Sequence, residues 1–219
     1  MTRTRLQLTI VIALAFALVI GLSVHLTMVR NQNAAAATDF GKASLVTDEM
    51  HLLSTADDNT VTLVEFLDFE CESCAALYPT MERIRSEYEG RITLGIRYFP
   101  LPSHTNSDLA ARAVEAASRQ GKLTEMYHRM FETQLQWGES TQSQLPLFTE
   151  FARDLGLDVD VFARDIDDPA VAARVEQDFV DGLALGVQGT PTLFLNDTEL
   201  PSMPTFDELS TWIDAELER

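Results

Sequence analysis

Two cysteines, Cys71 and Cys74, are the residues of this 219-residue chain whose type and spacing point most clearly to chemistry. They are the only cysteines in the sequence, and Glu72 and Ser73 separate them. A strand-like segment leads into Cys71 and a helix-like segment follows it, so Cys71 is expected at a helix N-terminus. Free backbone N–H groups and the helix dipole favour an anion there, which predicts that Cys71 is a thiolate nucleophile. Cys74 lies nearly one turn later on the same face and is predicted to be the more buried, resolving thiol.

A structural disulfide and a metal site are the alternatives to redox exchange. A disulfide that closes so short a loop removes little entropy from the unfolded chain, so it would stabilise the fold only weakly. A metal site needs about four ligands. The sequence has no second cysteine pair, and its histidines are scattered: His25, His51, His104 and His128. Redox exchange is the favoured interpretation, and both alternatives stay open here.

The segments around the cysteines predict the frame that positions them. Val61–Phe69 and Arg91–Phe99 are rich in β-branched and aromatic residues and predict two strands. Residues 74–88 between them have helical spacing of apolar residues, and Gly90 follows as a stop signal.

The second half of the chain predicts a block of helices and then a return to the sheet. Residues 106–186 are mainly helical in pattern, residues 190–197 regain strand character, and residues 205–218 predict a closing amphipathic helix. This order predicts an α/β fold over residues 59–219, with a large helical insertion at about 106–186.

The N-terminal segment predicts a membrane anchor. After two arginines, residues 6–29 form an apolar run that would reach roughly 36 Å as a helix, enough to cross a hydrocarbon core of about 30 Å. A cleaved signal peptide is the alternative, but the small residues at 34–37 lie far beyond the strongest apolar run. We therefore expect residues 1–30 to be a cytoplasmic start and transmembrane signal-anchor, and residues 31–58 to be an extracytoplasmic tether and extension.

The net charge of −18 limits the partners of this protein. Such a charge repels polyanions, so nucleic acid is not expected to bind. Solubility outside the cytoplasm is the simplest interpretation of the acidity.

Residues Gly186–Leu195 add a second motif, because Thr190-Pro191 stands directly before the late strand. An X-Pro bond entering a strand can be cis, and it offers a tight turn with an exposed backbone edge. A strand, C-x-x-C at a helix start and G-T-P-T before a late strand together resemble the thioredoxin fold. The helical insertion is similar to that of the DsbA-like family of exported thiol–disulfide oxidoreductases. Residues 97–122 resemble the insertion entry of its membrane-anchored Gram-positive and actinobacterial members.

This resemblance implies roles for individual residues. Cys71 would be the nucleophile and Cys74 its partner, with Pro191 as the cis proline beside them and Thr190 contacting the backbone of a bound client. Glu65 matches the family's buried carboxylate, which relays a proton near the resolving thiol. Burial would raise the pKa of that carboxylate, and an ordinary edge position is the alternative.

Other residues in the similar region are expected to serve packing. His104 and Asn106 match common positions at the entry to the insertion, where we expect capping and packing rather than catalysis. Tyr127, Phe131 and Trp137 are expected in the core rather than in a client groove.

The dipeptide Glu72-Ser73 departs from the strongly oxidising relatives, which usually have Pro and His between the cysteines. A helix terminus stabilises a thiolate by roughly 0.3–2 kcal/mol. A carboxylate about 7 Å away, from Glu72 or Glu70, would oppose it by roughly 0.6–2.4 kcal/mol. We therefore predict a less stabilised thiolate and a less oxidising pair than in those relatives.

The resemblance implies a cell-membrane protein with one transmembrane helix and an extracytoplasmic catalytic domain. It would oxidise reduced exported client proteins and use no cofactor beyond its own disulfide. A membrane partner similar to vitamin K epoxide reductase would reoxidise it. A disulfide reductase, an isomerase, a non-catalytic client-binding module and a thiol-based metal chaperone are the alternatives.

Overall fold

The structure is a computed structural model that describes residues 43–56 and 60–219 of the chain. The predicted transmembrane segment at 6–29 and half of the predicted tether and extension at 31–58 lie outside these residues. None of the helices in the described part combines the length and apolarity needed to cross a membrane.

A five-stranded sheet with the order β1-β3-β2-β4-β5 forms the centre of the described residues. Its strands are β1 (His51–Ser54), β2 (Thr62–Leu67), β3 (Thr93–Tyr98), β4 (Thr192–Leu195) and β5 (Thr198–Glu199). The two central strands, β2 and β3, are parallel, whereas β4 runs antiparallel to β2. The predicted α/β fold is therefore confirmed.

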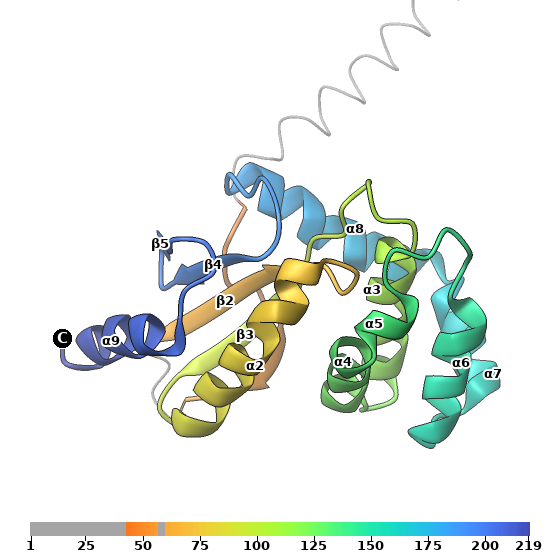
Figure 1. Cartoon of the computed structure of the whole chain (residues 1–219), viewed down its shortest axis with the longest axis horizontal. Helices are drawn as coiled ribbons and strands as arrows, with labels where there is room; N and C mark the ends of the chain where they lie inside the picture. Colours follow the sequence, from red (N-terminus) through yellow and green to blue (C-terminus); the bar gives the residue numbers. More distant parts are fainter. Residues whose placement is uncertain (1–42, 57–59) are drawn as a thin grey trace, which may run out of the picture. The chain divides into compact units, whose positions relative to one another are not determined.

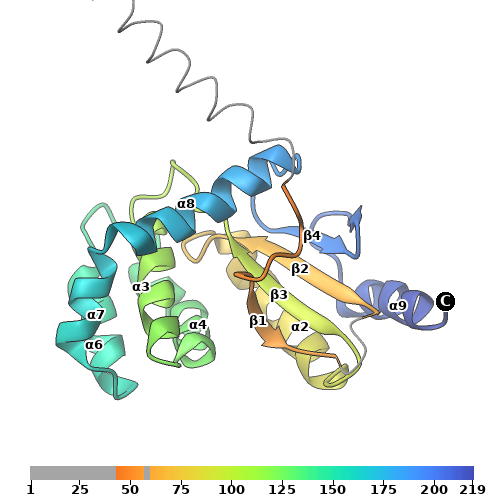
Figure 2. The same ribbon diagram turned by 180° about the vertical axis from the view of Figure 1, so that it is seen from behind.

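Helices surround the sheet on both faces and at one end (Figures 1 and 2). They are α2 (Glu72–Glu87), α3 (Ser107–Arg119), α4 (Leu123–Glu132), α5 (Gln134–Trp137), α6 (Leu145–Asp154), α7 (Val159–Ile166), α8 (Pro169–Ala184) and α9 (Phe206–Leu217). The run from α3 to α8 corresponds to the predicted insertion, and α3 to α7 gather at one end of the sheet.

Two apolar layers hold the helices to the sheet. Alternate residues of β2 point to opposite faces. Leu63 packs with α2 and α9 on one face, whereas Val64 and Phe66 pack with residues of the α8 region on the other. Glu65, which lies between Val64 and Phe66, therefore points to the same face as Leu63, toward α2.

A third cluster joins the N-terminal end of α2 to the insertion. It contains both cysteines together with Tyr127, Phe131 and Trp137, which are at most 6% exposed. The expectation that these three aromatic residues belong to the core is confirmed.

The strands β1 and β5 were not predicted from the sequence. β1 lies within the predicted extension at 31–58 and pairs antiparallel with β3 at the edge of the sheet. It is only partly buried and β5 has two exposed residues, so neither carries the apolar signal of a central strand.

Candidate redox-active site

Cys71 lies at the junction of β2 and α2, as the sequence pattern predicts. It is the N-cap residue of α2, in an extended conformation with φ −72° and ψ 123°. Its backbone N–H donates a hydrogen bond to the Asp68 carbonyl at 3.1 Å, and its own carbonyl accepts one from Ala75 at 3.1 Å. The cysteine is thus fixed where a strand ends and a helix begins.

The structure brings the two cysteines and the turn before β4 together. Both thiols are free; Cys71 is 6% exposed and Cys74 is fully buried. The Cys71 Sγ donates a hydrogen bond to the Thr190 carbonyl at 3.4 Å, and the Thr190-Pro191 bond is cis. Residues 119 positions apart in the sequence therefore meet at one sulfur atom.

The two thiols have opposite pKa shifts. The hydrogen bond from Cys74 lowers the pKa of Cys71 to about 5, against the effect of burial and helped by the Thr190 side chain and the backbone N–H groups of Cys74 and Ser73. Burial raises the pKa of Cys74 well above its ordinary value. The site therefore combines one thiol of lowered pKa with one of raised pKa.

Glu65 is buried at 2% exposure on the face of β2 that α2 covers. Burial, and secondly the negative charge of Cys71, raise the pKa of Glu65 to about 8. Its charge in turn contributes to the raised pKa of Cys74. Glu65 is therefore a buried carboxyl on the α2 side of the sheet whose charge acts on the Cys74 thiol.

The predicted opposition of Glu70 and Glu72 to the Cys71 thiolate stays a prediction, because both carboxyl groups have other partners. The Glu70 carboxylate is buried and accepts a hydrogen bond from the Asn106 N–H at 2.6 Å. The interaction of the Glu72 carboxyl with Glu139 lowers the pKa of Glu72. None of the main influences on the pKa of Cys71 comes from a carboxylate.

A hydrogen-bonded Asp–His pair beside Cys71 was not anticipated. The Asp68 carboxylate is fully buried and lies 2.6 Å from Nδ1 of His104, which is 20% exposed. Asp68 also accepts hydrogen bonds from the N–H groups of Glu70 at 2.9 Å and Leu101 at 3.1 Å. The one signal in the sequence is an acidic residue between Leu67 and Phe69 at the end of a buried strand.

His104 and Asn106 were expected to cap and pack. Asn106 is the N-cap residue of α3, but its side chain makes no cap hydrogen bond. It binds the loop before α6 instead, through the carbonyls of Ser140 and Gln142 and the N–H of Gln144. Asn106 therefore serves packing.

Gln134 is a second buried residue that the sequence did not indicate. Its Nε2 donates hydrogen bonds to the carbonyls of Phe69 at 3.1 Å and Cys71 at 2.8 Å. The amide lies on α5, so the helical insertion holds the chain on both sides of Glu70.

A cavity of about 400 Å³ opens beside the turn before β4. Gln188, Thr190, Pro191, Glu199 and Ser202 are among its lining residues. Within residues 43–56 and 60–219, no group of three or more His, Cys, Asp or Glu side chains is arranged to hold a metal ion.

Solved structures share this fold. A thioredoxin-like oxidoreductase from Silicibacter pomeroyi is 26% identical, with a TM-score of 0.67 over 81% of this chain and 97% of that one. BdbD from Bacillus subtilis is 23% identical, with a TM-score of 0.69 over 78% and 94%. α-DsbA1 from Wolbachia pipientis is 18% identical, with a TM-score of 0.71 over 80% and 94%. The last two support the fold alone.

Curated relatives match over part of their length. The Na(+)/H(+) antiporter NhaA of Herminiimonas arsenicoxydans is 35% identical over 157 residues, which are 71% of this chain and 24% of the antiporter. An NhaA 1 of Mycolicibacterium gilvum is 34% identical over 64% of this chain and 22% of that protein. The chain thus spans about a quarter of the length of these relatives.

The family assignment rests on the sequence model described as thioredoxin, which matches residues 49–215 and so covers the sheet, both cysteines and the whole insertion. The chain therefore belongs to the thioredoxin family.

Proposed function

We propose that this protein catalyses thiol–disulfide exchange on exported proteins, with Cys71 as the nucleophile and Cys74 as the resolving thiol. The observation that carries the proposal is the environment of Cys71. Its thiol has a pKa lowered to about 5, and it lies against the Thr190 carbonyl of the turn before β4. A structural cysteine pair needs neither feature.

In the oxidase direction, which we favour, a client thiolate attacks the Cys71 Sγ of the Cys71–Cys74 disulfide. The bond between the two enzyme sulfurs breaks, and Cys74 takes a proton from Glu65, since the pKa of Glu65 is about 8 and that of Cys74 is higher still. A mixed disulfide joins the client to Cys71.

The second client thiol completes the exchange. It attacks the client sulfur of the mixed disulfide, releases its proton to solvent, and Cys71 leaves as a thiolate that its low pKa stabilises. Glu65 takes up a proton from solvent. Two electrons have then passed from the client to the enzyme. The same site runs in reverse as a reductase, so the direction depends on the reduction potential.

The turn before β4 is the proposed docking point for the client. Thr190 and Pro191 form part of the wall of the 400 Å³ cavity, and a client backbone would lie beside this turn, next to the Cys71 sulfur. Glu72 and Ser73 form the start of α2 next to the sulfur that the client attacks.

The wider setting belongs to the same proposal. Residues 1–30 would anchor the protein in the cell membrane, residues 31–58 would tether it, and residues 59–219 would act outside the cytoplasm. A membrane redox partner, similar to vitamin K epoxide reductase, would reoxidise the Cys71/Cys74 pair. The match to antiporters covers a quarter of their length and carries no transport activity to this chain.

Oxidation of a reduced peptide with two cysteines tests the proposal. We expect the disulfide form to oxidise the peptide, Cys71→Ser to abolish exchange, and Cys74→Ser to accumulate a mixed disulfide at Cys71 that is visible by mass spectrometry. Full exchange by Cys71→Ser would contradict the proposal, as would a disulfide form that leaves the peptide reduced.

A further inference from the structure

The loop that carries Cys71 is joined to the loop before α3 by three hydrogen bonds. Asp68 accepts from the Leu101 N–H at 3.1 Å and from the His104 ring at 2.6 Å, and Glu70 accepts from the Asn106 N–H at 2.6 Å. These bonds hold the His104 ring against the turn that leads into Cys71.

The partners of the His104 ring fix its tautomer. Asp68 already accepts two backbone N–H groups, so it is a carboxylate acceptor, and Nδ1 of His104 must be the donor. Nε2 is then the free nitrogen, with its lone pair available when the ring is neutral. Asp68 thus binds both the His104 ring and, through its carbonyl, the Cys71 N–H. A buried carboxylate that orients an imidazole within electrostatic reach of a nucleophile is the arrangement expected of an acid–base group.

The charged and titratable groups around His104 come from several elements. Asp68, Glu70 and Cys71 act on it from the loop after β2. Glu72 on α2 and Glu139 after α5 also interact with its charge. Burial lowers the pKa of His104, but Asp68 and the other negative groups raise it above its ordinary value.

We propose that His104, oriented by Asp68, is the acid–base residue that takes the proton of the incoming client thiol through Nε2. The inference rests on the proposed thiol–disulfide exchange and adds a catalytic residue to it. No histidine stands between Cys71 and Cys74, so this imidazole supplies the basic group from a different part of the chain.

In the first step of exchange, one proton moves to His104 and another leaves Glu65. The client thiol gives its proton to Nε2 of His104, and the resulting thiolate attacks the Cys71 Sγ. The Cys71–Cys74 bond breaks, and its electron pair goes to the Cys74 sulfur, which Glu65 protonates. When Cys71 later leaves as a thiolate, it faces an imidazolium, which stabilises the reduced form. Release of that proton accompanies reoxidation.

The pH dependence of exchange separates this role from a structural one. An ordinary thiol of pKa ~8.5 is about 3% ionised at pH 7, so a base that ionises the client thiol can accelerate attack by up to roughly 30-fold. With His104→Gln, which keeps a donor for Asp68, we expect client oxidation to fall roughly 10- to 30-fold at pH 7. At pH 9, where the thiol ionises unaided, the two rates should lie within about twofold.

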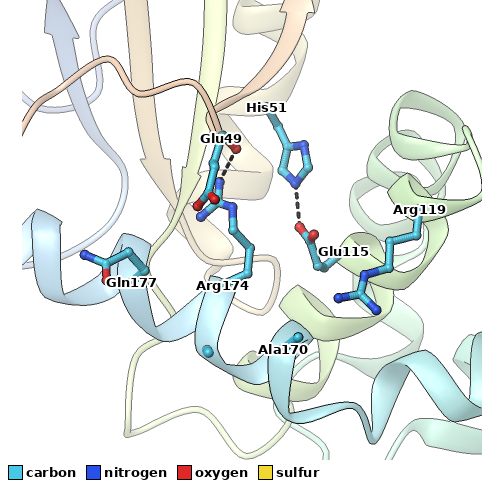
Figure 3. A pocket seen from close by; sticks show the side chains of 8 residues that line it. Glu49, His51, Glu115, Arg119, Ala170, Arg174 and Gln177 are labelled. Carbon is cyan, nitrogen blue, oxygen red and sulfur yellow. Dashed lines mark hydrogen bonds and ion pairs between the residues drawn. The ribbon is translucent and has the colours of Figure 1, made fainter.

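The chain offers a matched control in a pocket between β1, α3 and α8 (Figure 3). There His51 lies 2.6 Å from Glu115 and is 14% exposed, so the pair resembles His104–Asp68 in length and burial. We expect His51→Gln to exchange at the wild-type rate at both pH values. An equal loss for His104→Gln at pH 7 and pH 9, or no loss at all, would overturn the proposal.

A second measurement needs no variant. NMR titration of the His104 ring should give a higher pKa in the reduced protein than in the disulfide form, because the Cys71 thiolate is then present. Equal values in the two forms would place the ring too far from the sulfur and would refute the assignment. A wild-type protein that oxidises no client would instead refute the proposed function. The NMR titration of His104 would still test whether the ring lies close to the Cys71 sulfur.

Discussion

At the scale of single residues, hydrogen bonds rather than neighbouring carboxylates set the charge on Cys71. The Cys74 thiol and the N–H groups of Ser73 and Cys74 lower its pKa, whereas the carboxylates of Glu70 and Glu72 are bound elsewhere. The sequence shows which residues flank a thiol, but not where their side chains point.

Glu65→Gln is expected to stabilise the fold above pH 4.5. The pKa of Glu65 rises from 4.5 to about 8 on folding, so between these values the unfolded chain ionises while the folded protein must keep the proton. Stability is therefore lost as the pH rises through this window. The variant should gain on the order of 3 kcal/mol in free energy of unfolding at pH 7.

Denaturant unfolding of both proteins between pH 4 and pH 8 measures this gain. The difference should vanish toward pH 4, where the carboxyl is protonated in both states. A gain that is independent of pH would mean that packing, and not ionisation, distinguishes the two side chains.

At the scale of elements, close approach of α8 to the sheet depends on one glycine. A Cβ atom at Gly182 would lie 2.8 Å from the Phe99 ring and 3.1 Å from the Phe66 ring. Both rings belong to the apolar layer between α8 and the sheet. Gly182 thus lets α8 lie across the face of the sheet that α2 does not cover (Figure 2).

Whether Gly182→Ala raises or lowers the free energy of unfolding shows how closely α8 packs on the sheet. An alanine in an unobstructed helix raises stability by about 1 kcal/mol over glycine. Here the methyl group meets two buried rings, so we expect a loss of about 1–3 kcal/mol in free energy of unfolding. A stabilised variant in thermal or denaturant unfolding would show that α8 packs less closely than described.

The elements differ in how well the sequence predicts them. β2, α2 and β3 were predictable because the apolar residues of each form a long pattern that is typical of either a strand or a helix throughout. β1 and β5 were not, because they are short and exposed and form only by pairing with strands already in place. The pairing of Asp68 with His104, and the contact of Gln134 with Cys71, join segments at least 36 residues apart and depend on the fold of the insertion.

At the scale of the whole molecule, the low pKa of Cys71 couples redox state to stability. The pKa falls from 9.0 in the unfolded chain to about 5 in the reduced fold. The resulting stabilisation is complete above pH 9 and is lost as the pH falls through 5. The disulfide form lacks this contribution, and its short loop removes little entropy from the unfolded chain.

The reduced protein should therefore gain stability over the disulfide form as the pH rises from 5 to 9. Melting temperatures of the two forms across this range test the coupling. Both forms should carry Glu65→Gln, because the Glu65 carboxyl lowers the stability of the fold as the pH rises and would mask the effect of Cys71. A difference that stays constant with pH would contradict a thiolate at Cys71.

The reduction potential of the Cys71/Cys74 pair against glutathione tests the central claim most directly. Thioredoxin, with a thiol pKa of about 7, has a potential near −270 mV, and DsbA, with a pKa of about 3.5, lies near −120 mV. A pKa of about 5 falls between them, so an oxidase at this site should show a potential of roughly −230 to −150 mV. A value at or below about −270 mV would contradict the oxidase direction, and a pair that does not exchange with glutathione would contradict the redox function itself.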